Sequence, residues 1–248
     1  MDNSIYTVLA GNVGVFNNLT TIANNVANNN TYGYKADTSM FSQYITKDIN
    51  DKNAMPNDFT TVSDFKEGAL KVTNRPLDFA INGVGFFAVQ TPLGVRYTRK
   101  GDFRLNNENI LVTPEGYPVL SDGGDNIMFD INDREPLVSA EGIVYVYNGA
   151  DRSNPEQRGT IGVFNFLNSK LLRKAGDNLF MSDIPGEIQE NINYKIVQNA
   201  VEESNVNSIM EMNKLIQVQR QAEISTSLTD GIYSVYKNAY RVISKQTM

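Results

Sequence analysis

The chain has 248 residues and a formal net charge of −6, and it contains no cysteine, histidine or tryptophan. Without thiol and imidazole groups it cannot build a cysteine nucleophile, a histidine-based triad or a zinc site of cysteine and histidine ligands. The acidic balance argues against nucleic-acid binding, which needs clustered lysine and arginine. We therefore expect no enzyme activity, no cofactor, no metal site and no small-molecule substrate.

Residues 1–27 are predicted to form a helix. Apolar residues recur there at spacings of three and four, as in a coiled-coil seam, with one asparagine at a core position. The seam residues are Ile5, Val8, Asn12, Val15, Leu19, Ile22 and Val26. Asp2 is the only charged residue before Lys35, and polar residues interrupt the apolar ones. We therefore expect neither a cleaved signal peptide nor a transmembrane helix.

Small and amide side chains dominate the end of this helix and the segment that follows. They include Asn24, Asn25, Asn28, Thr31, Gly33 and Tyr34. Small side chains permit close approach of backbones, and uncharged amides both donate and accept hydrogen bonds where many copies pack together. We interpret residues 28–75 as an extended linker that includes this signature segment. Residues 187–204 are interpreted as a return linker, and both are expected to pack late, in an assembly.

The middle of the chain, residues 76–186, is predicted to form a central all-β domain. Fourteen of the 18 glycines and seven of the eight prolines fall between residues 68 and 186, which is typical of many short strands and turns. Expected strands cover 77–82, 85–90, 95–98, 110–112, 143–147 and 159–166. The glycines of 83–88 match a dinucleotide-binding pattern, but strand-like flanks favour a hairpin turn at Asn82 and Gly83 instead.

Two pairs of carboxylates are candidate catalytic acids. They are Glu202 with Glu203, and Asp130 with Asp133. Such pairs can hydrolyse glycosides without histidine. Both pairs lie in polar surroundings, so we interpret them as parts of solvated faces.

Residues 205–248 are predicted to form a second helix with two apolar stripes. One is a seam at spacings of three and four, and the other holds Ile224, Leu228, Val235 and Val242. The seam contains Leu215, Val218, Ala222, Ser225, Thr229, Ile232, Tyr236, Ala239 and Ile243. Two stripes indicate that the helix meets more than one neighbour. The predicted fold class is α+β, with a coiled-coil-like pair of terminal helices, although a helical hairpin packed in one domain remains an alternative.

Several motifs in this order resemble the bacterial flagellar axial proteins, the rod and hook family. The family signature at the first helix end is matched by Ala23, Asn24, Asn25, Val26, Ala27, Asn28, Thr31, Gly33, Tyr34 and Lys35, with Tyr34 where phenylalanine is usual. Residues 75–87, 97–103, 111–120 and 204–207 are similar to further family segments. Residues 217–223 follow, with Gln221 and Ala222 where Ala-Tyr is common in relatives.

The resemblance implies a structural subunit of the flagellar rod. Members are exported by the flagellar type III apparatus without a cleaved signal and assemble helically in the periplasm. There they form part of the drive shaft and export channel and transmit torque. The implied partners are other copies and other rod proteins, with no nucleic acid and no membrane insertion. Size and the first six residues resemble proximal rod members, with distal rod and hook subunits as alternatives and a soluble ligand-binding module as a more distant one.

The expected assembly interface combines the two helix seams with the signature segment. From the first helix and the signature it takes Ile5, Val8, Asn12, Val15, Leu19, Ile22, Val26, Asn24, Asn25, Asn28, Thr31, Gly33 and Tyr34. From the second helix it takes Leu215, Val218, Ala222, Ile232, Tyr236 and Ile243.

Overall fold

The computed structural model describes residues 3–45, 54–131, 133–148, 155–166, 168–182, 188–189 and 193–246. The chain divides into two compact units. Unit 1 contains Met1–Ala27, Asp37–Asp64 and Asn207–Met248, and unit 2 contains Asn28–Ala36 and Phe65–Val206. In the part of the chain that the structure describes, no helix combines the length and the hydrophobicity needed to span a membrane.

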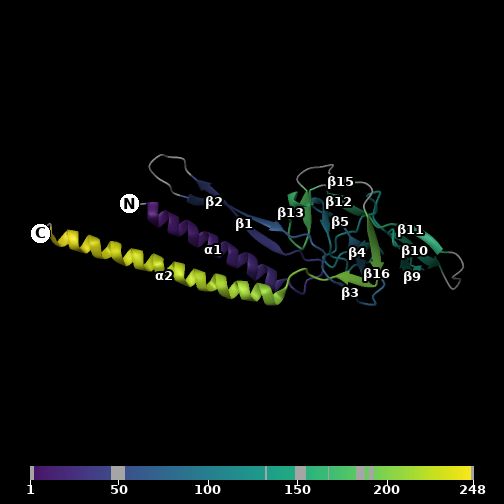
Figure 1. Ribbon diagram of the computed structural model, residues 1–248. Coiled ribbons are helices and arrows are strands. Elements are labelled where there is room, and N and C mark those ends of the chain that lie inside the picture. Colours follow the sequence, from purple (N-terminus) through teal and green to yellow (C-terminus); the bar gives the residue numbers. More distant parts are fainter. Residues whose placement is uncertain are drawn as a thin grey trace. The chain divides into compact units, whose positions relative to one another are not determined.

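Unit 1 contains the two helices, α1 (Asn3–Ala27) and α2 (Ser208–Gln246), which lie side by side and run antiparallel (Figure 1). α1 contains no charged residue. At the start of α2, the side-chain oxygen of Asn207 accepts a hydrogen bond from the Met210 amide at 3.1 Å. This is the geometry of an N-cap, which satisfies a helix-end amide that has no partner within the helix.

A β-hairpin completes unit 1. β1 (Asp37–Ile45) and β2 (Ala54–Ser63) pair antiparallel, with Asp37 opposite Ser63 and Ile45 opposite Ala54. A bulge interrupts the pairing between Ser42 and Gln43. These strands lie in the segment that we expected to be an extended linker. The extended conformation is present, but the backbone groups are paired within the single chain, which satisfies their hydrogen bonds without a partner molecule.

The largest sheet of unit 2 has six strands in the order β13-β14-β6-β5-β12-β15, among the described residues. Their bounds are β5 (Phe86–Thr91), β6 (Gly94–Thr98), β12 (Val163–Phe166), β13 (Leu172–Lys174), β14 (Phe180–Ser182) and β15 (Ile188–Gln189). A second sheet has the order β11-β10-β9, with β9 (Asp133–Val138), β10 (Ile143–Asn148) and β11 (Pro155–Thr160). A short 3-10 helix, Ser169–Leu171, precedes β13.

Three strand pairs complete the described part of unit 2. β4 (Phe79–Gly83) pairs with β16 (Tyr194–Gln198), and β3 (Leu70–Val72) pairs with β17 (Ala200–Glu202). β7 (Arg104–Leu105) pairs with β8 (Leu111–Val112). The segment expected as a return linker therefore contributes β16 and β17, which hydrogen-bond strands more than 100 residues earlier.

Two strand predictions require correction. β4 and β5 do not form the expected hairpin around Gly83, because β4 pairs with β16 while β5 pairs with β6 and β12. The predicted strand 159–166 is two strands that change partner: β11 joins β10, and β12 joins β5. The change occurs at Gly162, where an added Cβ would lie only 2.7 Å from the Ser121 carbonyl oxygen. Close backbone approach at this glycine separates the two strands.

The core of unit 2 consists of two clusters of buried side chains. The larger cluster includes Phe79, Phe87, Leu111 and Ile161. The smaller cluster is mostly aromatic, with Phe86 and Phe180 in its centre and the half-buried Phe65 packed against both. Burial of these side chains supplies the main stabilisation of the β unit.

Candidate assembly surface

The α1–α2 contact in unit 1 contains a polar layer at Asn12. The Asn12 side-chain amide donates a hydrogen bond to the Thr229 hydroxyl at 3.1 Å, and its oxygen accepts one from the Ser225 hydroxyl. Thr229 in turn donates to the Ser225 carbonyl oxygen at 2.9 Å. Polar groups inside an apolar helix contact are satisfied in one alignment only. The layer lies at the seam position where the sequence places Asn12.

The predicted seam residues whose side chains are described are all buried or half-buried. Ile22 and Val218 are buried, at 5% and 8% exposure. Half-buried positions are Asn12, Val15, Leu19, Val26, Leu215, Ala222 and Ile232. The second stripe is exposed at Ile224, Leu228 and Val235. The side chains of Ile5, Val8, Tyr236, Ala239, Val242 and Ile243 lie outside the described residues.

Asn25 connects the end of α1 to other elements of unit 1. Its amide nitrogen donates to the Asp37 carbonyl oxygen at 2.8 Å, and its side-chain oxygen accepts from the Asp37 amide at 2.9 Å. The same nitrogen lies 3.3 Å from a carboxylate oxygen of the buried Glu211 on α2. The Asn25 side chain thus pairs with β1 as a backbone group would. Asn24, by contrast, is on the exposed face of α1.

The signature segment beyond α1 is folded into unit 2. Thr31 donates a side-chain hydrogen bond to Asn28 at 3.1 Å, and its amide bonds to the Asn28 carbonyl oxygen at 3.2 Å, which closes a turn. Gly33 follows with a φ of +65°. An added Cβ at Gly33 would lie 2.4 Å from backbone atoms of Arg99 and Lys100. Glycine is required here by both the backbone conformation and the close approach.

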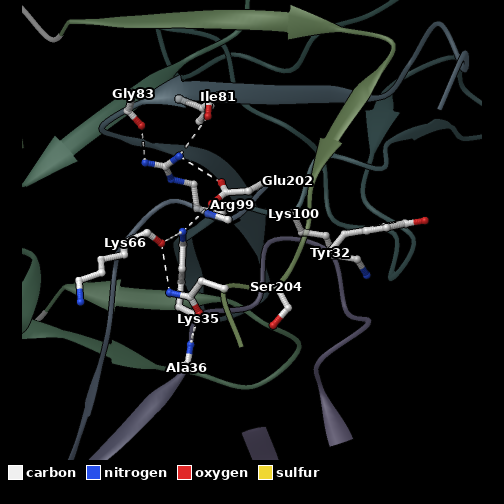
Figure 2. A network of polar contacts seen from close by, with 12 residues as sticks. Tyr32, Lys35, Ala36, Lys66, Ile81, Gly83, Arg99, Lys100, Glu202 and Ser204 are labelled. Carbon is white, nitrogen blue, oxygen red and sulfur yellow. Dashed lines mark hydrogen bonds and ion pairs between the residues drawn. The ribbon is translucent and has the colours of Figure 1, made fainter. Parts of the chain in front are cut away.

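A buried network of charges lies beside this segment (Figure 2). The Lys35 ammonium is 2.6 Å from one carboxylate oxygen of Glu202, and the Arg99 guanidinium is 3.2 Å from the other. The first oxygen also accepts from the Gly68 amide at 2.8 Å. The Glu202 backbone oxygen accepts from the Gly33 amide at 2.7 Å. Glu202 is therefore bonded to three other segments of unit 2, at Gly33 and Lys35, at Gly68 and at Arg99.

The two cations of this network also bond backbone carbonyls. Lys35 donates to the Lys66 oxygen at 2.7 Å, and Arg99 donates to the Gly83 oxygen at 2.7 Å. Burial lowers the pKa of the Lys35 ammonium, while the Glu202 carboxylate opposes that shift. Buried charges are tolerated only when they are paired and hydrogen-bonded, and this arrangement meets both conditions. The role of this network is structural, because its ion pairs and hydrogen bonds hold segments of unit 2 together.

Tyr34, which precedes Lys35 in the signature, is also buried. Its ring lies 4.0 Å from the Lys174 ammonium, a cation–π contact, and Lys174 also donates to the Lys35 carbonyl oxygen at 2.8 Å. Gly33 and Tyr34 therefore have internal packing roles within unit 2. Their expected role in contacts between copies stays a prediction.

The interpretation of Glu202 as part of a solvated face was wrong. Its side chain is 1% exposed, and its partners Arg99 and Lys35 lie 103 and 167 residues away in sequence. Adjacent acidic residues give no local signal of such pairing, because both partners lie far away in sequence. The neighbouring Glu203 does have the exposed side chain we expected, and it is 3.5 Å from Lys71.

The second carboxylate pair also divides into one buried and one exposed residue. The Asp133 side chain is 3% exposed and accepts two hydrogen bonds from Arg158, at 2.7 and 2.8 Å. Asp130 is exposed and lies 2.7 Å from the same guanidinium. Burial works to raise the pKa of Asp133, but the hydrogen bonds from Arg158 and the backbone hold it below its ordinary value. The interpretation of this carboxylate pair as part of a solvated face was therefore wrong for Asp133, whose buried carboxylate forms an ion pair with Arg158.

The sequence of this chain is similar to those of known flagellar proteins. Residues 80–146 match the family model for the flagellar hook protein FlgE/F/G D1 domain. The flagellar basal-body rod protein FlgF of Mesorhizobium japonicum is 34% identical over 248 residues, covering all of both chains. FlgF of Caulobacter vibrioides is 34% identical over 250 residues, covering 99% of each. FlgG of Buchnera aphidicola subsp. Baizongia pistaciae is 32% identical and covers 85% of this chain and 88% of its own length.

These similarities extend through both units rather than through the β unit alone. The family model falls inside unit 2, whereas the full-length relatives align with α1 and α2 as well. An identity of 34% over the full length of both proteins is sufficient to establish common descent. The chain belongs to the family of flagellar basal-body rod proteins.

Proposed function

We propose that the chain is a structural subunit of the flagellar rod, of the proximal type. Relatives named FlgF align over 92–100% of the chain, whereas those named FlgG align over 74–85%, which supports this assignment over a distal rod subunit. The function is mechanical: subunits pack into a helical shaft that transmits torque. Its mechanism is packing and not chemistry.

The observation that carries this proposal is the pairing of the two ends of the chain. α1 and α2 associate through an apolar seam with a polar layer at Asn12, as a coiled-coil pair would. We propose that this pair forms the inner layer of the assembly and that Asn12 sets its register. The seams and the signature segment would form the interface.

Assembly of this kind requires partners and a location. We propose that the subunit contacts other copies and other rod proteins in the periplasm, after passage through the flagellar type III apparatus. An interface repeated head to tail generates an open helical polymer, as a shaft requires. The uncharged α1 suits this role, since no like charges meet where copies pack.

Substitution of a seam residue by aspartate tests the proposal. Ile232→Asp places a charge in the half-buried α1–α2 contact, and Leu19→Asp does so from the α1 side. Both variants should abolish swimming in cells that lack the native gene, and neither should be found in purified basal bodies. Amide hydrogen exchange in unit 2 should remain that of the unchanged chain.

The matched control is Thr226→Asp, which places the same charge on an exposed position of α2. This variant should swim. Normal swimming by Ile232→Asp would contradict the seam assignment. Absence of the unchanged chain from basal bodies would contradict the rod function itself.

A further inference from the structure

α1 carries an apolar face that no described residue of unit 1 covers. Val13 and Phe16 are each more than half exposed. The same face continues through Thr20 and Ala23, both exposed. No charged side chain occurs in Asn3–Ala27, so a partner could cover this face without desolvating a charge. Phe16 is the one large aromatic ring among the described side chains of this face.

α2 carries a matching face with a hollow. Ile224, Leu228 and Val235 are 58–68% exposed. A surface hollow of about 410 Å³ opens at Gly231 and is lined by Ser227, Leu228, Gly231, Ile232 and Val235. An added Cβ at Gly231 would meet nothing within 4 Å, so the missing side chain leaves this space open. The only charged residue between positions 224 and 235 is Asp230.

The two faces lie on opposite sides of the helix pair. Each residue of an α-helix is rotated by about 100° about the helix axis from the one before it. In a view along α1 from its N-terminus, the mean direction of Val13 and Phe16 is therefore about 100° clockwise from the α1 seam. In a view along α2 from its own N-terminus, Leu228 and Val235 lie anticlockwise from the α2 seam by a similar angle. Because the helices are antiparallel, opposite senses correspond to opposite sides of the pair.

We propose that the α1 face of one copy docks on the α2 face of a second copy, with Phe16 in the hollow at Gly231. Two complementary faces on opposite sides make a heterologous contact, which repeats from copy to copy instead of closing a two-fold dimer. The ring supplies the bulk that the glycine lacks, and neither face presents a charge to the other. This inference rests on the proposed rod function and names the partner surface within it.

Disulfide cross-linking tests the contact directly, because the chain has no native cysteine. A chain with both Phe16→Cys and Leu228→Cys, expressed in cells without the native gene, is oxidised and basal bodies are purified. Non-reducing electrophoresis should show a ladder of dimers, trimers and larger species, since each copy offers one cysteine to each neighbour. A mixture of the two single variants should stop at dimers.

Control variants test the proposed contact between copies separately from the proposed rod function. Replacing Leu228→Cys by Thr226→Cys moves the thiol to the other flank of α2 and should give no ladder. Val13→Cys with Val235→Cys is a second pair across the same contact and should repeat the ladder. Incorporated protein that yields no ladder from either pair overturns the proposal and leaves the rod function intact. Absence of every variant and of the unchanged chain from basal bodies overturns both.

Discussion

Unit 2 encloses a core with both apolar and charged groups inside it, whereas unit 1 buries a seam between its two helices and leaves a second apolar face of each helix exposed. In unit 2, Phe87 and Phe180 are inaccessible and even Lys35 and Glu202 are enclosed. In unit 1, Ile22 and Val218 are buried while Phe16 and Leu228 remain exposed. A monomer can complete a core of the first kind alone. The second kind retains apolar surface that only contact with another molecule would remove from water.

The largest expected effect comes from removing the anion of the buried network. Glu202→Gln leaves Lys35 and Arg99 buried without a carboxylate, which should destabilise unit 2 by about 3–5 kcal/mol. Amide hydrogen exchange in increasing urea, read separately in β17 and in α1, measures this. The matched control is Glu203→Gln at the exposed neighbour, which should change stability by less than about 1 kcal/mol. Equal effects of the two variants would show that the network does not stabilise the unit.

The next largest loss of stability is expected from a substitution in the helix seam, and it should be confined to unit 1. Ile22→Ala removes a side chain that is 5% exposed and should cost unit 1 about 2–5 kcal/mol, with unit 2 unchanged. Val13→Ala, on the exposed face of the same helix, should alter folding by less than about 0.5 kcal/mol. The same exchange experiment reports both units. If Ile22→Ala also lowered the protection of amides in unit 2, the two units would not be independent in stability, and the prediction would fail.

Gly33 tests whether the signature segment is internal to unit 2. Gly33→Ala and Gly116→Ala both place a side chain at a positive φ, +65° and +96°. Only the first brings its Cβ within 2.4 Å of backbone atoms, whereas the second meets nothing within 4 Å. Gly33→Ala should therefore be the less stable by about 1–3 kcal/mol. Identical melting of the two variants would argue against the close packing at Arg99.

The smallest effect is pH-dependent. Asp133 has a folded pKa below its ordinary 3.8, so its ion pair contributes stability above that pH and loses it as the pH falls through the folded pKa. Arg158→Met should cost unit 2 about 1 kcal/mol at neutral pH, and the difference from the unchanged chain should shrink below pH 3.8.

Denaturation at a series of pH values measures this difference. Asp130→Asn, which alters the exposed partner of the same arginine, serves as the control and should have little effect at any pH. A difference for Arg158→Met that stays constant down to pH 2 would refute the pairing. The chargeless α1 should show no corresponding change.

The helices were predictable because their signals are local. Seam residues recur every three or four positions, and Ile22 and Val218 are buried as that spacing predicts. Local signals also indicated most strands of unit 2, although the partner exchange at Gly162 was missed. β16 and β17 pair with strands more than 100 residues earlier, so no local signal marked them, and they were interpreted as a linker. β1 and β2 were also interpreted as a linker, although their pairing is that of neighbouring strands.

The sequence by itself determined the periodic helices, the β-rich middle and the resemblance to the rod and hook family, because spacing and motif order are readable along one stretch of chain. Only the tertiary structure decided that Glu202 is buried between Lys35 and Arg99. It also decided that Phe16 and Leu228 stay exposed while their seam neighbours do not. The environment of a charge or an apolar ring is set by residues brought from elsewhere in the chain, and no local pattern encodes which residues those are.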